Sequence, residues 1–157
     1  MSTLTNVPAG TIKVGDTTTY TRTCTFEDIQ LFARVSGDVN PVHLDEEFAS
    51  QTPFGQRIAH GMYTAGLISA AVGLQLPGPG TIYLGQSLKF RAPVFVDDVI
   101  TVAMEVTAVR EDKPIVTLDV VCRNQDDKVV VSGEATVLAP AEALSIEAPN
   151  LPPISIG

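Results

Sequence analysis

Residues 61–74 read Gly61-Met-Tyr-Thr-Ala-Gly-Leu-Ile-Ser-Ala-Ala-Val-Gly-Leu74. This stretch is apolar around nearly its whole circumference and rich in small residues, and Pro77-Gly-Pro-Gly80 follows it as a terminator. A helix without a polar face is normally enclosed by other elements, and small side chains let those elements approach closely. The stretch therefore predicts one long helix that is buried on every side.

Downstream of this helix the apolar period changes from about 3.6 residues to 2. Polar turns at 111–114 and 124–127 separate the later segments. This pattern predicts an antiparallel meander of long strands, which we expect over 82–90, 99–109, 115–122 and 129–138. Upstream the chain reads as helical: Thr25 and Asp28 form a capping-box-like start, and Gly37 is a suitable C-terminal cap.

A helical first half followed by a meander indicates an α+β fold in which a curved antiparallel sheet wraps one central helix. We expect a single domain over 1–157, with a core at about 20–140 and an extended, proline-rich tail at 141–157. Such a sheet leaves an exposed edge or face that a second copy of the chain could cover.

Composition narrows the possible partners. The 157 residues include ten Lys and Arg against eighteen Asp and Glu, for a net charge of −8, so a nucleic-acid partner is not expected. No stretch is apolar and long enough to cross a membrane, and the N-terminus lacks the features of a signal peptide. Cys24 and Cys122 match no metal or redox spacing, which favours two reduced, packed thiols in a cytoplasmic protein.

Polar residues concentrate in Ser36-Gly-Asp-Val-Asn-Pro-Val-His-Leu-Asp45. Asp38 and His43 are too far apart in sequence to be neighbours on one helix face, but the intervening Asn40-Pro41 forces a turn that can bring them together. A carboxylate and an imidazole that share a water are suited to moving protons at neutral pH. The alternative is structural: Asp38 would bond locally at the turn, and His43 would be a packed core residue.

A second element, Arg57-Ile-Ala-His60-Gly61-Met62, leads into the buried helix. The Gly61 N–H lies where a helix leaves donors without intrahelical partners, so it can receive a developing negative oxygen. Gly61 could equally serve only to permit a tight entry into the helix. His60 is more plausible as a structural residue than as a catalytic one.

Two further groups of residues are candidate ligand sites. His43, Asp45 and His60 could bind a metal, but the spacing is weak, and we expect none. Lys89 and Arg91 share one face of a predicted strand, and a basic pair in an acidic chain could hold the phosphates of a cofactor such as coenzyme A. A solvated strand face is the simpler explanation for this pair.

These residues together point to a known family. The run Phe32-Ala-x-x-Ser-Gly-Asp-x-Asn-Pro-x-His-x-Asp45, followed by Arg57 to Met62, resembles the MaoC-like hydratase signature. Leu76-Pro-Gly-Pro-Gly-Thr-Ile-Tyr-Leu-Gly-Gln86 and Phe90-Arg-Ala-Pro-Val94 resemble the bacterial (R)-specific enoyl-CoA hydratases that feed polyhydroxyalkanoate synthesis. The similarity covers about 20–140.

The resemblance implies a homodimeric hotdog fold and the syn addition of water to a trans-2-enoyl-CoA, giving an (R)-3-hydroxyacyl-CoA in fatty-acid or polymer metabolism. Carried over by position, Asp38 and His43 form the catalytic pair, with Asn40 in the same motif as a supporting residue. Ser69 supports the aspartate, and the Gly61 N–H binds the thioester oxygen. No cofactor is implied, because coenzyme A is part of the substrate.

Other functions stay open at this point. A hotdog acyl-CoA thioesterase would also use a carboxylate and a helix N-terminus, and a non-catalytic acyl-CoA-binding module would bind ligand without turnover. The sequence also leaves open which of Asp38 and His43 is the base, because a coupled pair titrates jointly. The acyl-chain length, the use of acyl-carrier-protein thioesters and assembly beyond a dimer are undetermined as well.

Overall fold

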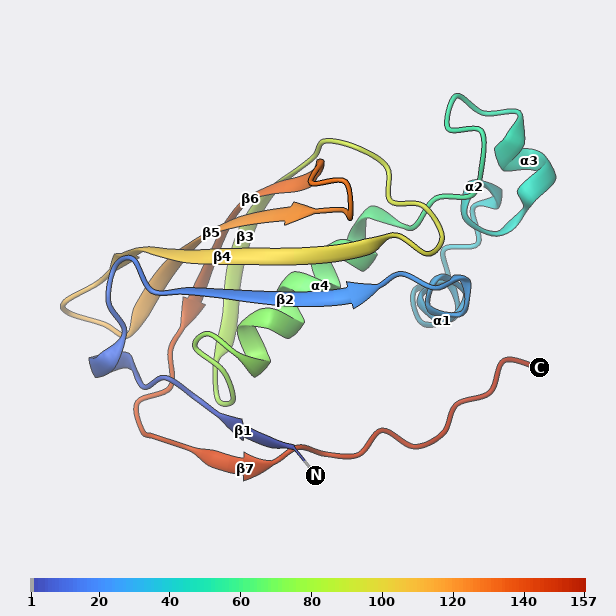
Figure 1. Cartoon of the computed structure of the whole chain (residues 1–157). Coiled ribbons are helices and arrows are strands. Elements are labelled where there is room, and N and C mark those ends of the chain that lie inside the picture. Colours follow the sequence, from blue (N-terminus) through green and yellow to red (C-terminus); the bar gives the residue numbers. More distant parts are fainter. Residues whose placement is uncertain (1) are drawn as a thin grey trace.

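Helix α4 (Gly61–Leu74) lies against a five-stranded antiparallel sheet that curves around it, as the computed structural model of residues 2–157 shows (Figure 1). This arrangement confirms the predicted α+β fold. The sheet contains β2 (Thr17–Thr23), β3 (Ile82–Phe90), β4 (Val99–Val109), β5 (Ile115–Arg123) and β6 (Val129–Leu138). Side chains of α4 and of the inner sheet face form the core, among them Ile68, Ile100, Met104, Leu118 and Val137.

The order of the strands differs from a simple meander. It is β2-β4-β5-β6-β3, so only β4, β5 and β6 follow one another both in sequence and in space. β3 lies beside β6 at one edge, and β2 lies beside β4 at the other. The expectation of a purely helical first half was wrong, because β2 is a strand. Its composition, Thr-Thr-Thr-Tyr-Thr-Arg-Thr, is rich in the β-branched and aromatic residues that favour strands.

Three helices precede α4, and local signals define each of them. In α1 (Phe26–Ser36) both bonds of the capping box form between Thr25 and Asp28, and Gly37 closes the helix at φ 81°. Next come α2 (Pro41–Leu44) and α3 (Glu46–Ser50), in which Asp45 caps α3 by accepting the Phe48 N–H. The predicted bend at 40–41 is therefore one turn of helix, which fixes the direction of the side chains that follow.

Helix α4 begins and ends where the sequence predicts, but the chain does not enclose it on every side. A stripe that includes Met62, Gly66 and Ser69 is exposed, while most of the remaining surface of the helix is buried. These residues recur at intervals of four and three, so they lie along one side of the helix. Complete enclosure of α4 would need a molecule other than this one chain. The composition of a helix does not show whether its own chain or another molecule covers it.

The two ends of the chain form a second, small sheet. β1 (Thr3–Thr5) pairs with β7 (Ser145–Glu147), and the buried Asn6 side chain bonds to Pro79, Glu142 and Leu144. After β7 the chain continues to Gly157 without a further helix or strand (Figure 1).

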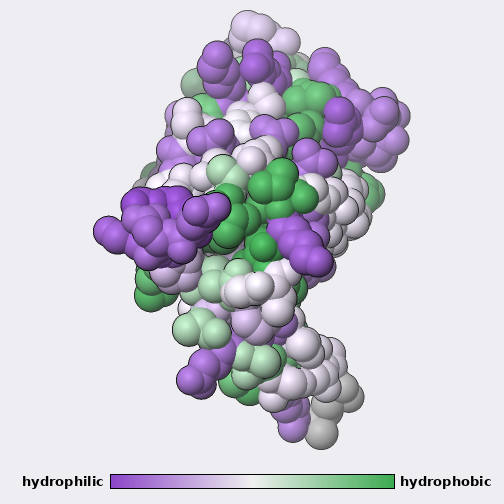
Figure 2. Space-filling model, turned by 90° about the vertical axis from the view of Figure 1, so that its left-hand side faces the viewer, coloured by the Kyte–Doolittle hydropathy of each residue, from purple (hydrophilic) through white to green (hydrophobic). Residues whose placement is uncertain are grey.

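Both cysteines are free and buried, as expected, and burial raises the pKa of Cys24 and of Cys122 to about 12. In the described part of the chain no helix is long and apolar enough to span a membrane. Figure 2 shows the end of the molecule opposite α1, α2 and α3, where hydrophilic side chains surround a central apolar group.

Candidate active site

The bend between α1 and α2 orients the Asp38 carboxylate. Its Oδ1 accepts the backbone N–H of Asn40 at 3.1 Å, and the Asn40 side chain accepts the N–H of Val42 at 3.3 Å as the cap of α2. One carboxylate oxygen is therefore occupied locally, which leaves Oδ2 free to face α2. This is the local bonding that the structural alternative predicted, but it uses only half of the carboxylate.

His43 is buried on α2, with 8% of its surface exposed. Its Nδ1 lies 2.7 Å from the carbonyl oxygen of Ile58, and a carbonyl can only accept, so Nδ1 carries the proton. In the neutral imidazole Nε2 is then a bare acceptor. Burial is the main cause that lowers the pKa of His43, and the charge of His60 lowers it further, against the opposing effects of Ile58 and Asp38.

The two free acceptor atoms, Asp38 Oδ2 and His43 Nε2, lie close together. His43 Nε2 is 4.0 Å from Asp38 Oδ2. A water that donates one hydrogen to each of two acceptors, at ~2.8 Å each, holds those acceptors roughly 4 to 4.5 Å apart. The predicted convergence of Asp38 and His43 is thus present in the geometry. A water held in this way would have both hydrogens occupied and a lone pair directed outward.

His60 also belongs to this cluster, although we expected it to be merely structural. Its ring stacks on His43 with the centroids 3.8 Å apart, and its Nε2 lies 2.9 Å from the backbone oxygen of Asp38. Phe32 packs against it at 4.8 Å, and only 3% of its surface is exposed. One sign of this role is visible in the sequence, because His60 is one of only two histidines in the chain.

Asp38, His43 and His60 present potential metal-binding atoms within 4.8 Å of one another. Asp45, which the sequence suggested as a ligand beside the two histidines, is not in this group. The hydrogen bonds argue against using this group for a metal. His60 Nε2 donates to a carbonyl, so it has no lone pair to offer. Absence of a metal therefore stays our prediction, now supported by the tautomer that the neighbouring atoms require.

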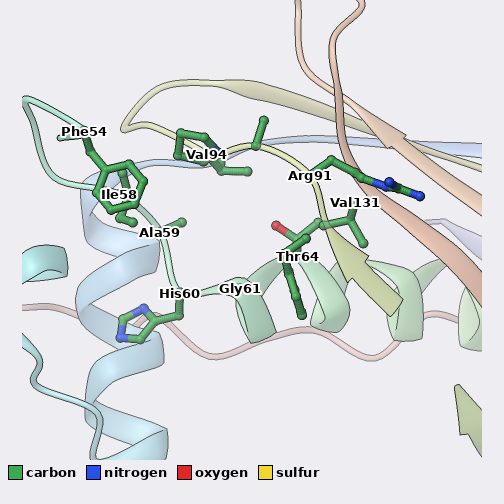
Figure 3. Close-up of a pocket in the computed structure, with 12 residues that line it drawn as sticks. Phe54, Ile58, Ala59, His60, Gly61, Thr64, Arg91, Val94 and Val131 are labelled. Atoms are coloured by element: carbon green, nitrogen blue, oxygen red, sulfur yellow. The ribbon is translucent and has the colours of Figure 1, made fainter. Parts of the chain in front are cut away.

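Gly61 opens α4 and lines a cavity of about 400 Å³ with Phe90, Arg91 and Val94 (Figure 3). Among residues 2–157 the Gly61 N–H has no hydrogen-bond acceptor, so it is available to an oxygen in the cavity. A Cβ on this residue would lie 2.8 Å from Cε1 of Phe90, which explains why glycine suits the position. In Figure 3 the Thr64 hydroxyl points into the cavity, while the His60 ring points away.

Ser69 is not where we expected it. It was predicted on an enclosed helix beside Asp38, but it is exposed and lines a separate hollow with Phe32, Met62 and Tyr83. Eight residues separate it from Gly61, or ~12 Å along the helix axis. Within residues 2–157 Ser69 makes no hydrogen bond to Asp38. Its role in supporting Asp38 therefore stays a prediction, and no contact within this one chain carries it. The family pattern gives its position in sequence but no information about which side of α4 it faces.

Lys89 and Arg91 do lie near each other, in a shallow hollow on the outside of the sheet with Asp119 and Glu134. The Arg91 Nε donates to Ser132 at 3.0 Å, and its side chain points away from the Gly61 cavity (Figure 3). Lys89 does not line that cavity at all. Binding of coenzyme A by this pair stays a prediction, and the nearby carboxylates weaken the local positive charge.

The chain is similar in sequence to known proteins. The sequence profile of the MaoC-like domain family matches residues 9–126. An (R)-specific enoyl-CoA hydratase of Rhodospirillum rubrum is 48% identical over 130 residues, which cover 83% of this chain and 90% of that protein.

Solved structures give the same result. R-hydratase PhaJ1 from Pseudomonas aeruginosa is 50% identical with a TM-score of 0.95, covering 99% of this chain and 100% of that one. The (R)-hydratase from A. caviae involved in PHA biosynthesis is 47% identical with a TM-score of 0.80, covering 82% and 98%. The family match and the shared fold together show that this chain belongs to the MaoC-like dehydratase family.

Proposed function

We propose that the protein is an (R)-specific enoyl-CoA hydratase, a hydro-lyase that reversibly adds water to a trans-2-enoyl-CoA to give an (R)-3-hydroxyacyl-CoA. The observation that carries this proposal is the pair of acceptors, Asp38 Oδ2 and the bare His43 Nε2, 4.0 Å apart at the base of α4. The relatives named hydratases support it. Supply of monomers for polyhydroxyalkanoate synthesis, or a step of fatty-acid metabolism, would use the same product.

The site residues divide the reaction between them. The thioester oxygen accepts the Gly61 N–H, which draws electrons from the C2=C3 bond and makes C3 electrophilic. The water that Asp38 and His43 hold forms a bond to C3, its proton passes to His43 Nε2, and the π electrons move to the enolate oxygen at Gly61. Collapse of the enolate returns that proton from His43 to C2. The Asp38 carboxylate stabilises the transient imidazolium.

Stereochemistry follows from this arrangement. The water oxygen and the proton both reach the substrate from the side that carries Asp38 and His43, so the addition is syn. One flat alkene held at Gly61 therefore presents a single face, so the product has one configuration. The relatives named (R)-specific hydratases support the (R) alcohol as that product. Because the same proton leaves and returns through His43, the reaction needs no second acid.

The decisive experiment offers the purified protein one short and one medium trans-2-enoyl-CoA, and follows the loss of the enoyl-thioester absorbance. We expect hydration, and we expect chiral analysis to identify (R)-3-hydroxyacyl-CoA. A free-thiol assay with saturated acyl-CoA runs in parallel. Thiol release without hydration would favour the thioesterase, binding without either reaction would favour the non-catalytic module, and an (S) product would contradict the proposed face.

We also propose that two copies associate through β3 and the exposed stripe of α4. β3 pairs with β6 on one side, and its other edge has no partner strand among residues 2–157. Three of its side chains, Ile82, Leu84 and Phe90, are each more than half exposed. Met62, on α4, is 54% exposed as well. An open nine-residue strand beside apolar side chains is a surface that soluble proteins normally cover, and a two-fold axis would pair β3 with itself.

Light scattering should therefore give a molar mass near twice 16.6 kDa. We expect Leu84→Lys to weaken association at least about 10²-fold, because it would bury an unpaired charge at the two-fold interface. Val14→Lys, at a site that is 65% exposed on the approach to β2, is the matched control and should leave the mass unchanged. Equal masses for wild type and Leu84→Lys would refute this interface.

The pH dependence of hydration should reflect His43. Its Nε2 must be bare to take the proton, so kcat/KM falls as pH decreases through the pKa of His43. Burial and the charge of His60 lower this pKa from its ordinary value of 6.5. We therefore expect the midpoint of the acid limb below pH 6.5, measured as kcat/KM against pH with a short enoyl-CoA.

Asp38→Asn provides the control for this assignment. The Asp38 carboxylate raises the pKa of His43, so its removal should move the midpoint of the residual activity to still lower pH. A midpoint above 6.5 in the wild type, or one that Asp38→Asn moves upward, would count against His43 as the base.

A further inference from the structure

His60 lies beside every part of the catalytic arrangement, and its ring points away from the Gly61 cavity that the residue helps to line (Figure 3). Its Nε2 reaches the backbone oxygen of Asp38 at 2.9 Å, and its ring covers His43 at 3.8 Å. It is also the residue from which α4 begins, directly before Gly61. A single side chain thus links the bend between α1 and α2, the helix α2 and the N-terminus of α4.

The surroundings of His60 determine its chemical state. Because the Asp38 carbonyl can only accept, Nε2 must carry the hydrogen. Nδ1 is buried and has no hydrogen-bond partner among residues 2–157. The neutral imidazole of His60 therefore has its hydrogen on Nε2, where it is committed to the Asp38 carbonyl.

We propose that His60 is a positioning residue for the hydration reaction. It holds Asp38 and His43 in the positions, relative to the Gly61 N–H, that the reaction needs. This inference rests on the proposed function. Its donor fixes the backbone that carries Asp38, and its ring fixes the plane of His43. Since the reacting atoms must meet within a few tenths of an ångström, an error of 1 Å in one group can cost ~10² in rate.

Two substitutions separate positioning from simple packing. His60→Phe keeps a flat ring against His43 and removes the buried unpaired nitrogen, but it lacks the donor to Asp38. His60→Gln keeps an N–H at a similar reach and loses the ring. We expect His60→Phe to lower kcat about 10- to 100-fold with KM within about threefold of wild type. We expect His60→Gln to retain within about fivefold of the wild-type kcat.

Thermal melting must accompany these kinetics. A residue that only packs would lose activity in proportion to stability, whereas we expect His60→Phe to melt no earlier than wild type and still be slow. If His60→Phe retains wild-type kcat, or if His60→Gln is as slow as His60→Phe, the positioning role through the donor is refuted.

A measurement on the unaltered protein makes the test independent of both variants and of catalysis. Nitrogen-15 NMR of the two imidazoles should report a protonated Nε2 on His60, protected from solvent exchange, and a protonated Nδ1 on His43. A bare Nε2 on His60 would overturn the inference even if the enzyme were active. Absence of hydratase activity with the expected tautomers would instead refute the proposed function alone.

Discussion

Asp38→Asn and His43→Asn should each lower kcat for enoyl-CoA hydration by at least about 10²-fold, within the range that general acid–base catalysis usually contributes. Both substitutions preserve the local anchor. An asparagine at 38 still offers Oδ1 to the Asn40 N–H, and one at 43 can still donate to the Ile58 carbonyl. Each removes the acceptor that faces the water, and at 38 a donor takes its place.

Steady-state rates with a short trans-2-enoyl-CoA check this result, with circular dichroism and melting temperature as controls for folding. Since the two groups act on one water, the double variant should be about as slow as the slower single variant, not slower by the product of both effects. Near-wild-type turnover in either single variant would remove the pair from the mechanism. Fully multiplicative losses would show that the two groups do not share a water.

Those parts of the fold that depend on short-range signals could be predicted from sequence. The capping box at Thr25 and Asp28, the bounds of α4 and the caps of α2 and α3 involve residues within a few positions of one another. The convergence of Asp38 and His43 was predictable for the same reason, because Asn40 and Pro41 lie between them and define the turn.

What could not be predicted depends on contacts between distant segments. The position of β3 beside β6 is set by pairing across more than forty residues, which no local pattern encodes. The partner of His43 is a backbone carbonyl at Ile58, and carbonyls carry no sequence signature. Whether the side of α4 that carries Ser69 is buried depends on which elements cover the helix. Small residues suit a surface buried within the chain and a close interface with another molecule equally well, so they do not distinguish the two.

The catalytic arrangement combines polar groups that each have a structural bond as well as a chemical one. Asp38 uses Oδ1 for the turn and Oδ2 for the site, and His43 uses Nδ1 for Ile58 and Nε2 for the site. This division resolves the two interpretations that the sequence left open, because local bonding and catalysis engage different atoms of the same side chains. The local bonds also orient the acceptors before any substrate arrives, which is how preorganised sites lower a barrier.

Gly61→Pro should lower kcat about 10²- to 10³-fold, the usual cost of losing one oxyanion donor. Proline deletes the N–H while leaving the helix intact, since Gly61 is the first residue of α4, where proline is well tolerated. The preceding residue, His60, already has φ −60° and ψ 138°, the extended conformation that a following proline requires. Hydration rates with one enoyl-CoA, measured beside the melting temperature, give the effect.

Gly61→Ala is the matched control, because it adds the same Cβ and retains the N–H. That Cβ would approach Cε1 of Phe90 to 2.8 Å, but this atom is at the far end of a side chain whose ring can shift by the few tenths of an ångström required. We therefore expect Gly61→Ala to be slowed far less than Gly61→Pro. Should the two variants be equally slow, the loss would come from crowding against Phe90. Gly61 would then serve as the close-packed entry to α4, and the thioester oxygen would need another donor.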